Sequence, residues 1–223
     1  MSETVLILGG TREAADLATS LVAAHPNWRV ITSLAGRTRE PAPLAGETHI
    51  GGFGGPEGLA EYLRSERVTK LVDATHPFAK RISEHARLAA GRAGVPLETV
   101  TRPPWQKQPS DNWVEVASLE KARDALPIGA RVLLALGSQH IAVFASRGDV
   151  HFVVRMVDLP DSPLSLPDHQ LLLGKPGTAE QEKALLTAHA ITHIVCRNSG
   201  GTASFAKVEA ARQLGITVVM VRR

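Results

Sequence analysis

Short apolar runs alternate with longer segments of helical periodicity along the whole chain. In the first half, runs at 5–8, 29–33, 47–50, 70–73 and 97–101 predict strands, and helical periodicity falls at 13–24, 56–66 and 78–93. Strands that alternate with helices form parallel sheets covered by helices. The pattern therefore predicts an α/β fold with mostly parallel sheets and helices on both faces.

The second half repeats this scheme after a polar, proline-rich stretch at 103–112 that fits no periodic structure and predicts a linker. It separates a domain of residues 1–102 from one of residues 113–223. The predicted strands are 113–116, 131–135, 150–155, 193–196 and 217–221, and the predicted helices are 119–125, 141–147, 179–189 and 203–214.

One tripeptide occurs in both halves of the chain and indicates that the two halves arose by duplication. Phe-Ala-Lys opens a predicted helix at 78–80 and again at 205–207, and each helix is followed by glycine and a strand. The last strands of the two halves are then equivalent. The sequence leaves open whether these strands exchange between the two sheets.

Composition limits the classes of function. Only 4% of residues are aromatic, and the charges are scattered with a net of +3, which argues against nucleic acid and fits a small polyanionic ligand. The single cysteine, Cys196, lies in an apolar run and excludes an internal disulfide framework and a zinc-binding spacing. Neither a secretory leader nor an apolar run of membrane-spanning length is apparent, so we expect a cytoplasmic protein that binds no membrane.

The glycine turn after the first strand is the first candidate binding motif. A dinucleotide fingerprint would place glycine at positions 9, 11 and 14, and this chain has Gly9, Thr11 and the allowed Ala14. Gly10, Thr11 and Arg12 still offer amides and a hydroxyl at a helix N-terminus, which suits a phosphate group. A plain glycine turn is the alternative.

The segment after the second strand carries hydroxyls and guanidinium groups in place of an acid. An NAD site would have Asp or Glu there to hold the ribose hydroxyls. Ser33, Gly36, Arg37 and Thr38 instead suit the 2′-phosphate of NADPH, because an arginine fork matches phosphate oxygens. Solvated arginines in a loop are the alternative.

Two further strand ends carry residues suited to binding. The run 51–55 surrounds Phe53 with glycines, so a flat ligand can approach Gly52 closely, or Phe53 can swing over its ring; a flexible loop is the alternative. After the fourth strand, Thr75 can cap the next helix, and His76 is held at the mouth of the sheet. His76 is either functional or a structural histidine.

In the second half, the segment 197–201 is predicted to bind an anion, as the glycine turn of the first half is, and we call it the anion cradle. Lys207 follows in the next predicted helix. Asn198, Ser199 and Gly200 are its candidate cofactor-binding residues. The candidate substrate-binding residues are the cations and the flat ring at Arg102, Trp105, Arg155 and Arg197. No histidine pair with an intervening acid indicates a metal site.

Taken as a set, these motifs resemble the precorrin-6A reductase family, NADPH-dependent enzymes of corrin-ring biosynthesis on the path to cobalamin. The resemblance includes the segments 8–11, 33–37, 51–55, 73–79, 102–105, 198–201 with Lys207, and 218–220. It implies two Rossmann-like domains with substrate and cofactor in the cleft between them. It also implies hydride transfer from NADPH to one ring double bond of a tetrapyrrole polycarboxylate.

The resemblance leaves the proton donor open among His76, Lys207 and ordered water. Family members commonly carry lysine where Arg197 stands, and arginine does not titrate, so position 197 is a poor proton donor. We expect a monomer or a weak homo-oligomer. The alternatives are another NADPH-dependent reductase or a non-enzymatic NADPH sensor; a short-chain reductase is disfavoured because Tyr62, the only tyrosine, has no lysine four residues later.

Overall fold

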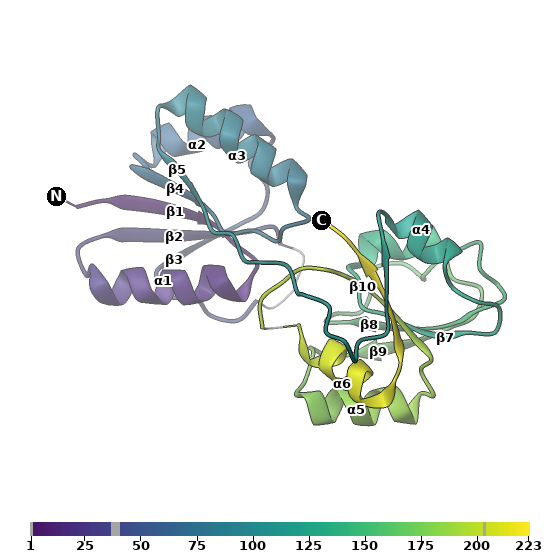
Figure 1. Ribbon diagram of the computed structural model, residues 1–223. Helices are drawn as coiled ribbons and strands as arrows, with labels where there is room; N and C mark the ends of the chain where they lie inside the picture. Colours follow the sequence, from purple (N-terminus) through teal and green to yellow (C-terminus); the bar gives the residue numbers. More distant parts are fainter. Residues whose placement is uncertain (1, 37–40, 203) are drawn as a thin grey trace. The chain divides into compact units, whose positions relative to one another are not determined.

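The computed structural model describes residues 2–36, 41–202 and 204–223. The chain divides into two compact units, Met1–Arg102 and Pro103–Arg223, and each unit is built on its own sheet (Figure 1). Residues 103–112, predicted as a linker, thus belong to the second unit. No helix among the described residues is both long and apolar enough to cross a membrane.

The first unit is a five-stranded parallel sheet in the order β3-β2-β1-β4-β5. Its apolar faces are covered by α1 on one side and by α2 and α3 on the other (Figure 1). The elements are β1 (Thr4–Leu8), α1 (Arg12–Ala24), β2 (Arg29–Leu34), β3 (Glu47–Ile50), α2 (Pro56–Ser65), β4 (Lys70–Asp73), α3 (Lys80–Ala93) and β5 (Leu97–Thr99).

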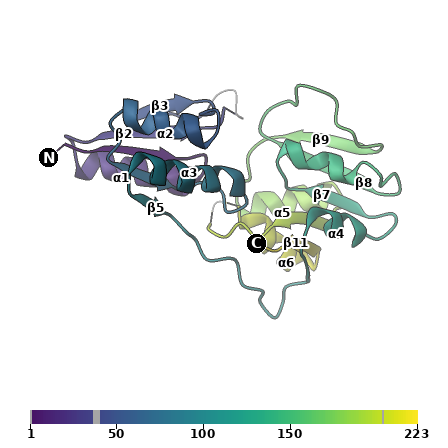
Figure 2. The same cartoon turned by 90° about the horizontal axis from the view of Figure 1, so that it is seen from above.

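The second unit is a six-stranded parallel sheet in the order β6-β11-β10-β7-β8-β9, and Figure 2 shows β9, β8 and β7 in succession. Helices α5 and α6 cover one face and α4 the other (Figure 1). The elements are β6 (Trp113–Val116), α4 (Leu119–Asp124), β7 (Arg131–Leu134), the 3-10 helix η1 (Ser138–Phe144), β8 (His151–Met156), β9 (His169–Leu173), α5 (Ala179–Ala188), β10 (His193–Arg197), α6 (Ala206–Leu214) and β11 (Thr217–Val221).

The same topology occurs in both units. The order β3-β2-β1-β4-β5 recurs as β9-β8-β7-β10-β11, with the elements following one another along the chain in the same sequence. β6 is an extra edge strand beside β11. The last strands β5 and β11 each pair within the sheet of their own unit, so the exchange that the sequence left open does not occur.

The strand registers also correspond. α3 and α6 each end on a glycine with positive φ, and the third residue after that glycine pairs with the neighbouring strand. Leu97 pairs with Leu71 in the first sheet, and Val218 pairs with Ile194 in the second. These positions are therefore equivalent, and residues of the two sheet edges can be compared one by one.

This register shows that the two Phe-Ala-Lys tripeptides do not occupy equivalent positions in the two units. Counted back from the cap glycines Gly94 and Gly215, Lys207 occupies the place of Ala86, whereas Lys80 lies about one and two-thirds turns earlier. Ala86 and Lys207 are both buried, and Lys80 is exposed. The duplication is visible in the topology, whereas the two tripeptides occupy different positions in their helices.

Candidate active site

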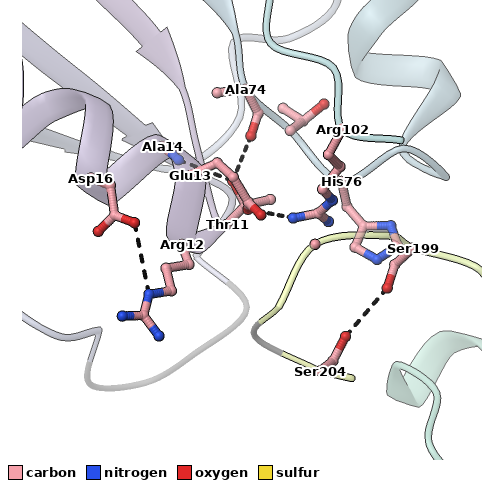
Figure 3. A network of polar contacts seen from close by, with 12 residues as sticks. Thr11, Arg12, Glu13, Ala14, Asp16, Ala74, His76, Arg102, Ser199 and Ser204 are labelled. Carbon is pink, nitrogen blue, oxygen red and sulfur yellow. Dashed lines mark hydrogen bonds and ion pairs between the residues drawn. The ribbon is translucent and has the colours of Figure 1, made fainter. Parts of the chain in front are cut away.

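Thr11 ties together the strands at which the order of the first sheet reverses, β1 and β4. It is the N-cap of α1, and its hydroxyl accepts a hydrogen bond from the Ala14 amide at 3.2 Å. The same hydroxyl donates to the carbonyl of Ala74, just after β4, at 2.7 Å (Figure 3). Open α/β sheets bind ligands at such a reversal.

The glycine turn before Thr11 is needed for steric and conformational reasons. A Cβ on Gly9 would lie 2.8 Å from Cγ2 of Thr32 and 3.2 Å from the carbonyl oxygen of Ser33. Gly10 has φ of +94°, which L side chains rarely adopt. The turn brings its backbone amides to the N-terminus of a 13-residue helix, where an anion is stabilised. Arg12 lies on the exposed side of this turn, 3.7 Å from Asp16.

Glu13 and Arg102 form an ion pair at the same edge (Figure 3). Burial disfavours ionisation of Glu13, but the hydrogen bond from Arg102, a backbone hydrogen bond and the nearby charges of Arg102 and His76 together outweigh it, so the pKa of Glu13 lies below its usual value. Both side chains line a small pocket with Thr11, Ala74, Thr75, Pro77 and Val100. Arg102, predicted to bind substrate, therefore lies beside the predicted phosphate site.

The segment after β4 differs from the prediction in one respect. Thr75 does not cap α3, whose N-cap is Ala79 and receives no side-chain bond. Instead, the Thr75 amide and hydroxyl both donate to Oδ1 of the buried Asp73, at 3.1 and 2.7 Å. The helix starts later than predicted because this turn, characteristic of Asp side chains, occupies the intervening residues.

His76 is held in one orientation by its own loop. Its Nδ1 accepts a hydrogen bond from the Phe78 amide at 3.3 Å. In the neutral ring the proton is then on Nε2. His76 is partly buried, and it lies just after β4 at this edge of the first sheet.

The ends of β2 and β3 position the remaining candidates of the first unit. Ser33 is buried, and its carbonyl accepts from the Gly9 amide at 2.9 Å. Gly36 has φ of +68°. Arg37 and Thr38, which we predict to bind the 2′-phosphate, lie outside the described residues.

Phe53 packs inward and anchors the glycine-rich loop. Its ring stacks on His49 with centroids 4.7 Å apart and meets Tyr62 of α2 edge-on at 5.0 Å. A Cβ on Gly58 would lie 1.7 Å from the Phe53 carbonyl oxygen, so the loop rests directly on α2. The structure therefore does not support a Phe53 that swings over a ligand ring. Gly52 has no atom near its Cβ position and remains open.

In the second unit, Asn198 and Trp105 hold the loop after β10. The Trp105 amide donates to Asn198 Oδ1 at 2.8 Å, and Asn198 Nδ2 donates to the Trp105 carbonyl at 2.9 Å. The Trp105 indole N–H donates to the Gly201 carbonyl at 2.7 Å. Gly200 has φ of +66°, and a Cβ there would lie 2.2 Å from the Pro103 carbonyl oxygen. The predicted linker thus shapes the loop that we predict to form the anion cradle.

The C-terminal residue and a serine pair complete this loop. Arg223 donates to the carbonyls of Asn198 and Ser199 at 2.9 and 2.6 Å. The hydroxyls of Ser199 and Ser204 lie 3.3 Å apart (Figure 3). Three of the predicted residues, Asn198, Ser199 and Gly200, are therefore adjacent in one loop that these contacts hold in place.

Lys207 lies beneath this loop and not on its surface. It is 4% exposed, its ammonium donates to the Ser204 carbonyl at 2.5 Å, and it lies 5.5 Å from the Trp105 ring centroid. Burial lowers the pKa of Lys207. In this position it supports the loop, and its role as a proton donor stays a prediction.

Two predicted substrate-binding arginines are also drawn inward. Arg155 bonds Glu182 at 2.6 Å, and the side chains are 7% and 2% exposed. Glu182 also accepts from the Gly177 amide at 2.9 Å, so the pair fastens the segment after β9. Burial lowers the pKa of Arg197, which is partly buried at the end of β10. Arg155 thus faces the interior in this structure.

Two features at these sheet edges were not predicted from the sequence. Glu13 lies beside the predicted phosphate site, and the signal that could have found it is an acid in the first turn of a helix. The turn after β7, residues 136–140, carries Leu-Gly-Ser, which resembles the Leu-Gly-Gly at the end of β1. Among the described residues, no group of three His, Cys, Asp or Glu could hold a metal ion.

A family model described as "Precorrin-6x reductase CbiJ/CobK" matches residues 4–223. The chain belongs to this family. Like other CbiJ/CobK members it is an oxidoreductase, which confirms the resemblance found in the sequence. The precorrin-6A reductase of Sinorhizobium sp. is 47% identical over 221 residues, covering 98% of this chain and 84% of the relative. That of Rhodococcus erythropolis is 45% identical over 222 residues, covering 98% and 88%.

A solved structure named "CobK precorrin-6A reductase" has a TM-score of 0.95 at 42% identity. The match covers 99% of this chain and 88% of that chain. The α/β fold with mostly parallel sheets, predicted from the sequence, is therefore confirmed for this CbiJ/CobK member.

Proposed function

We propose that the protein reduces one ring double bond of precorrin-6A to give the dihydro form, precorrin-6B, in cobalamin biosynthesis. The reaction takes hydride from NADPH and one proton from a protein group or water. Family membership supports the reaction class. The assignment to this chain's residues is carried by the two hydrogen bonds of the Thr11 hydroxyl, to Ala14 and Ala74, between β1 and β4, where the strand order of the first sheet reverses.

The residues at this edge fit a dinucleotide. Gly9 leaves no room for a Cβ because Thr32 and the Ser33 carbonyl of β2 lie against it, so the glycine turn packs closely on β2. Thr11 holds the N-terminus of α1 in place, and a phosphate is stabilised at such an N-terminus. The end of β2 offers Ser33 and no acid. When bound, NADPH supplies the hydride. Gly9, Gly10, Thr11 and Arg12 would hold its pyrophosphate, and a second set would hold its ribose and 2′-phosphate: Ser33, Gly36, Arg37 and Thr38.

His76 is our leading candidate for the proton donor. Its Nδ1 is occupied by the Phe78 amide, which directs Nε2 away from the backbone. To act as the donor, His76 would take up a proton on Nδ1, which breaks the hydrogen bond from the Phe78 amide, and would then pass its Nε2 proton to the substrate carbon next to the one that receives hydride. Lys207 would need the loop above it to open, since its ammonium is bonded to Ser204. Ordered water is the third candidate.

Substrate recognition is assigned to the cations and flat ring predicted from the sequence. Arg102, Trp105 and Arg197 would meet the carboxylate arms and the macrocycle, whereas Arg155 would act through its pair with Glu182. We propose a cytoplasmic monomer or weak homo-oligomer, because the reaction uses a cytoplasmic coenzyme and a small-molecule substrate.

An anaerobic turnover assay tests the proposal. Purified protein is mixed with NADPH or NADH and with precorrin-6A or cobalt-precorrin-6A, and absorbance of the reduced nicotinamide is followed. We expect NADPH to be oxidised with precorrin-6A, much faster than NADH. A nucleotide sensor would bind NADPH without oxidising it, and a different reductase would consume NADPH only with other acceptors; either result overturns the proposal.

A further inference from the structure

The second unit buries three charged side chains close to one another. Arg155 pairs with Glu182, and their side chains are 7% and 2% exposed. Lys207 is 4% exposed. Burial is the main cause that lowers the pKa of Lys207, and the charges of Cys196, Arg155 and Glu182 act on it as well. Arg155, Glu182 and Lys207 therefore lie within electrostatic range of one another, and we call them the charge cluster.

Each member of the charge cluster replaces a neutral residue of the first unit. The strand registers align the end of β8 with the end of β2. Helices α5 and α2 begin at the same distance along the chain from the equivalent ends of β9 and β3, and the cap glycines align α6 with α3. The equivalent residues are Arg155 and Ser33, Glu182 and Leu59, and Lys207 and Ala86.

The fold itself does not require these charges. In the first unit, Leu59 and Ala86 belong to one apolar cluster. In the second unit, Oε2 of Glu182 is buried and has no hydrogen-bond partner among the described residues. Replacing a buried ion pair with apolar residues often leaves stability unchanged or raises it. The charges are therefore kept at a cost in stability, which points to a function.

The charge cluster is bonded to two loops at the carboxyl edge of the second sheet. Oε1 of Glu182 accepts a hydrogen bond from the Gly177 amide at 2.9 Å, in the loop after β9. The Lys207 ammonium donates to the Ser204 carbonyl at 2.5 Å, in the loop after β10. Open α/β sheets bind their ligands beyond this edge. The cluster thus lies directly below the part of the second unit where a ligand is expected.

The charges of the cluster do not cancel. With Lys207 protonated, the cluster carries two positive charges and one negative charge. Arg155 bonds to the Glu182 carboxylate, whereas Lys207 bonds to a backbone carbonyl. An anion above the cluster favours the protonated form of Lys207. The attraction between them is also stronger than in water, because the protein interior has a lower effective dielectric constant.

We propose that the charge cluster attracts an anionic group of a ligand to the loops after β9 and β10. Glu182 allows two cations to be buried together, and Lys207 acts through its charge without leaving its place beneath the loop. The proposal rests on the proposed function, which supplies two polyanionic ligands. One is the tetrapyrrole with its carboxylates, and the other is the coenzyme with its phosphates.

Two variants with opposite effects on the charge test this proposal. Lys207→Met removes a positive charge and should weaken anion binding about tenfold. Glu182→Gln removes a negative charge but keeps an oxygen that can accept from Arg155 and Gly177, so it should strengthen binding by a similar factor. Titration calorimetry with uroporphyrin I, a stable tetrapyrrole octacarboxylate, and separately with NADP⁺, measures both effects.

The direction of the two changes decides the outcome. Affinities that shift in opposite directions support the proposal, and the ligand that shows them identifies the source of the anion. Loosened packing would weaken binding in both variants. Changes in the same direction, unchanged affinities for both ligands, or a wild type that binds neither ligand would overturn the proposal.

A buried ion pair at the other edge of the same sheet provides a matched control. Asp111 is buried just before β6 and bonds Arg212 at 2.8 Å, at the amino edge of the strands. Asp111→Asn changes the charge of the unit by the same amount as Glu182→Gln and should leave both affinities unchanged. An equal gain in affinity in these two variants would show that the net charge of the unit is responsible, and would also overturn the proposal.

A triple variant with the residues of the first unit gives a second test, which applies even if a single variant does not fold. We expect Arg155→Ser, Glu182→Leu, Lys207→Ala to unfold cooperatively in urea and to bind the anionic ligand about tenfold more weakly. Undiminished affinity would contradict the proposal. None of these measurements needs turnover. If the wild type fails to oxidise NADPH with precorrin-6A but the variants shift as expected, the proposed reaction falls and the charge cluster stands.

Discussion

Glu13, in the first turn of α1, forms an ion pair with Arg102, three residues beyond the end of β5. The pair joins the turn at the reversal of the first sheet to the end of the first unit. It also places a carboxylate next to the predicted phosphate site and neutralises it there. The pair is only partly exposed, so it should be measurable as a contribution to stability.

A double-mutant cycle with Glu13→Gln and Arg102→Gln should give a coupling energy of about 1 kcal/mol in urea unfolding at pH 7. Because the pKa of Glu13 is depressed in the folded state, this coupling is present above the unfolded value near 4.5. It should disappear as pH falls through the lower folded pKa. A cycle on the exposed pair Glu84 and Arg87 is the control, and a Glu13–Arg102 coupling no larger than that one would contradict the prediction.

Gly9→Ala should destabilise the protein by about 1–3 kcal/mol, because its Cβ would collide with Thr32 and the Ser33 carbonyl. It should also weaken NADPH binding, since the displaced turn carries the amides that we assign to the pyrophosphate. Gly91→Ala in α3 is the matched control: nothing beyond its own helix lies within 4 Å of its Cβ position. Unfolding curves and coenzyme titration measure both effects, and equal behaviour of the two variants would count against the close approach at Gly9.

Arg37→Ala should raise the KM for NADPH at least tenfold and leave the KM for NADH nearly unchanged. The reason is that a guanidinium–phosphate contact contributes roughly 1.5–3 kcal/mol, and NADH has no 2′-phosphate. Arg81→Ala, on the exposed side of α3, serves as the control. Steady-state kinetics with both coenzymes decides the matter; parallel changes for NADPH and NADH would rule out a 2′-phosphate contact.

Lys207→Met should change how stability depends on pH. Burial lowers the folded pKa of Lys207, so the unfolded chain binds its proton more tightly. Wild-type stability should therefore rise with pH between the folded pKa and the unfolded value near 10.4. The methionine variant should lack that part of the slope, whereas Lys80→Met, an exposed site, should keep it. Urea unfolding from pH 7 to 10 provides the test, and identical slopes for Lys207→Met and wild type would refute it.

The central strands could be predicted from the sequence because their residues are buried and apolar on both faces. β1 and β10 are examples, and each was placed to within a residue. β9 was missed because its residues, His169–Leu173, lie at the sheet edge and are mostly exposed, so neither composition nor alternation marks it. The helix predicted at 141–147 is the 3-10 helix η1, which begins earlier and is too short to show helical periodicity.

The candidate site was predictable only where local chemistry sufficed. Thr11 could be identified because a hydroxyl before a helix is a local signal. The contacts of Phe53, Arg155 and Lys207 involve other side chains of the folded protein, and the hydrophobic periodicity of the sequence does not predict such contacts. Their inward placement follows from packing against α2, α5 and the loop after β10.

Trp105 gives the loop after β10 an optical reporter. Its indole N–H is bonded to Gly201, and the Lys207 ammonium lies 5.5 Å from the ring centroid. Indole emission shifts with nearby charge and with the strength of such a bond. A ligand that bound at this loop would therefore change the emission wavelength and the quantum yield of Trp105. The rate of binding could then be measured from intrinsic fluorescence, without an added dye.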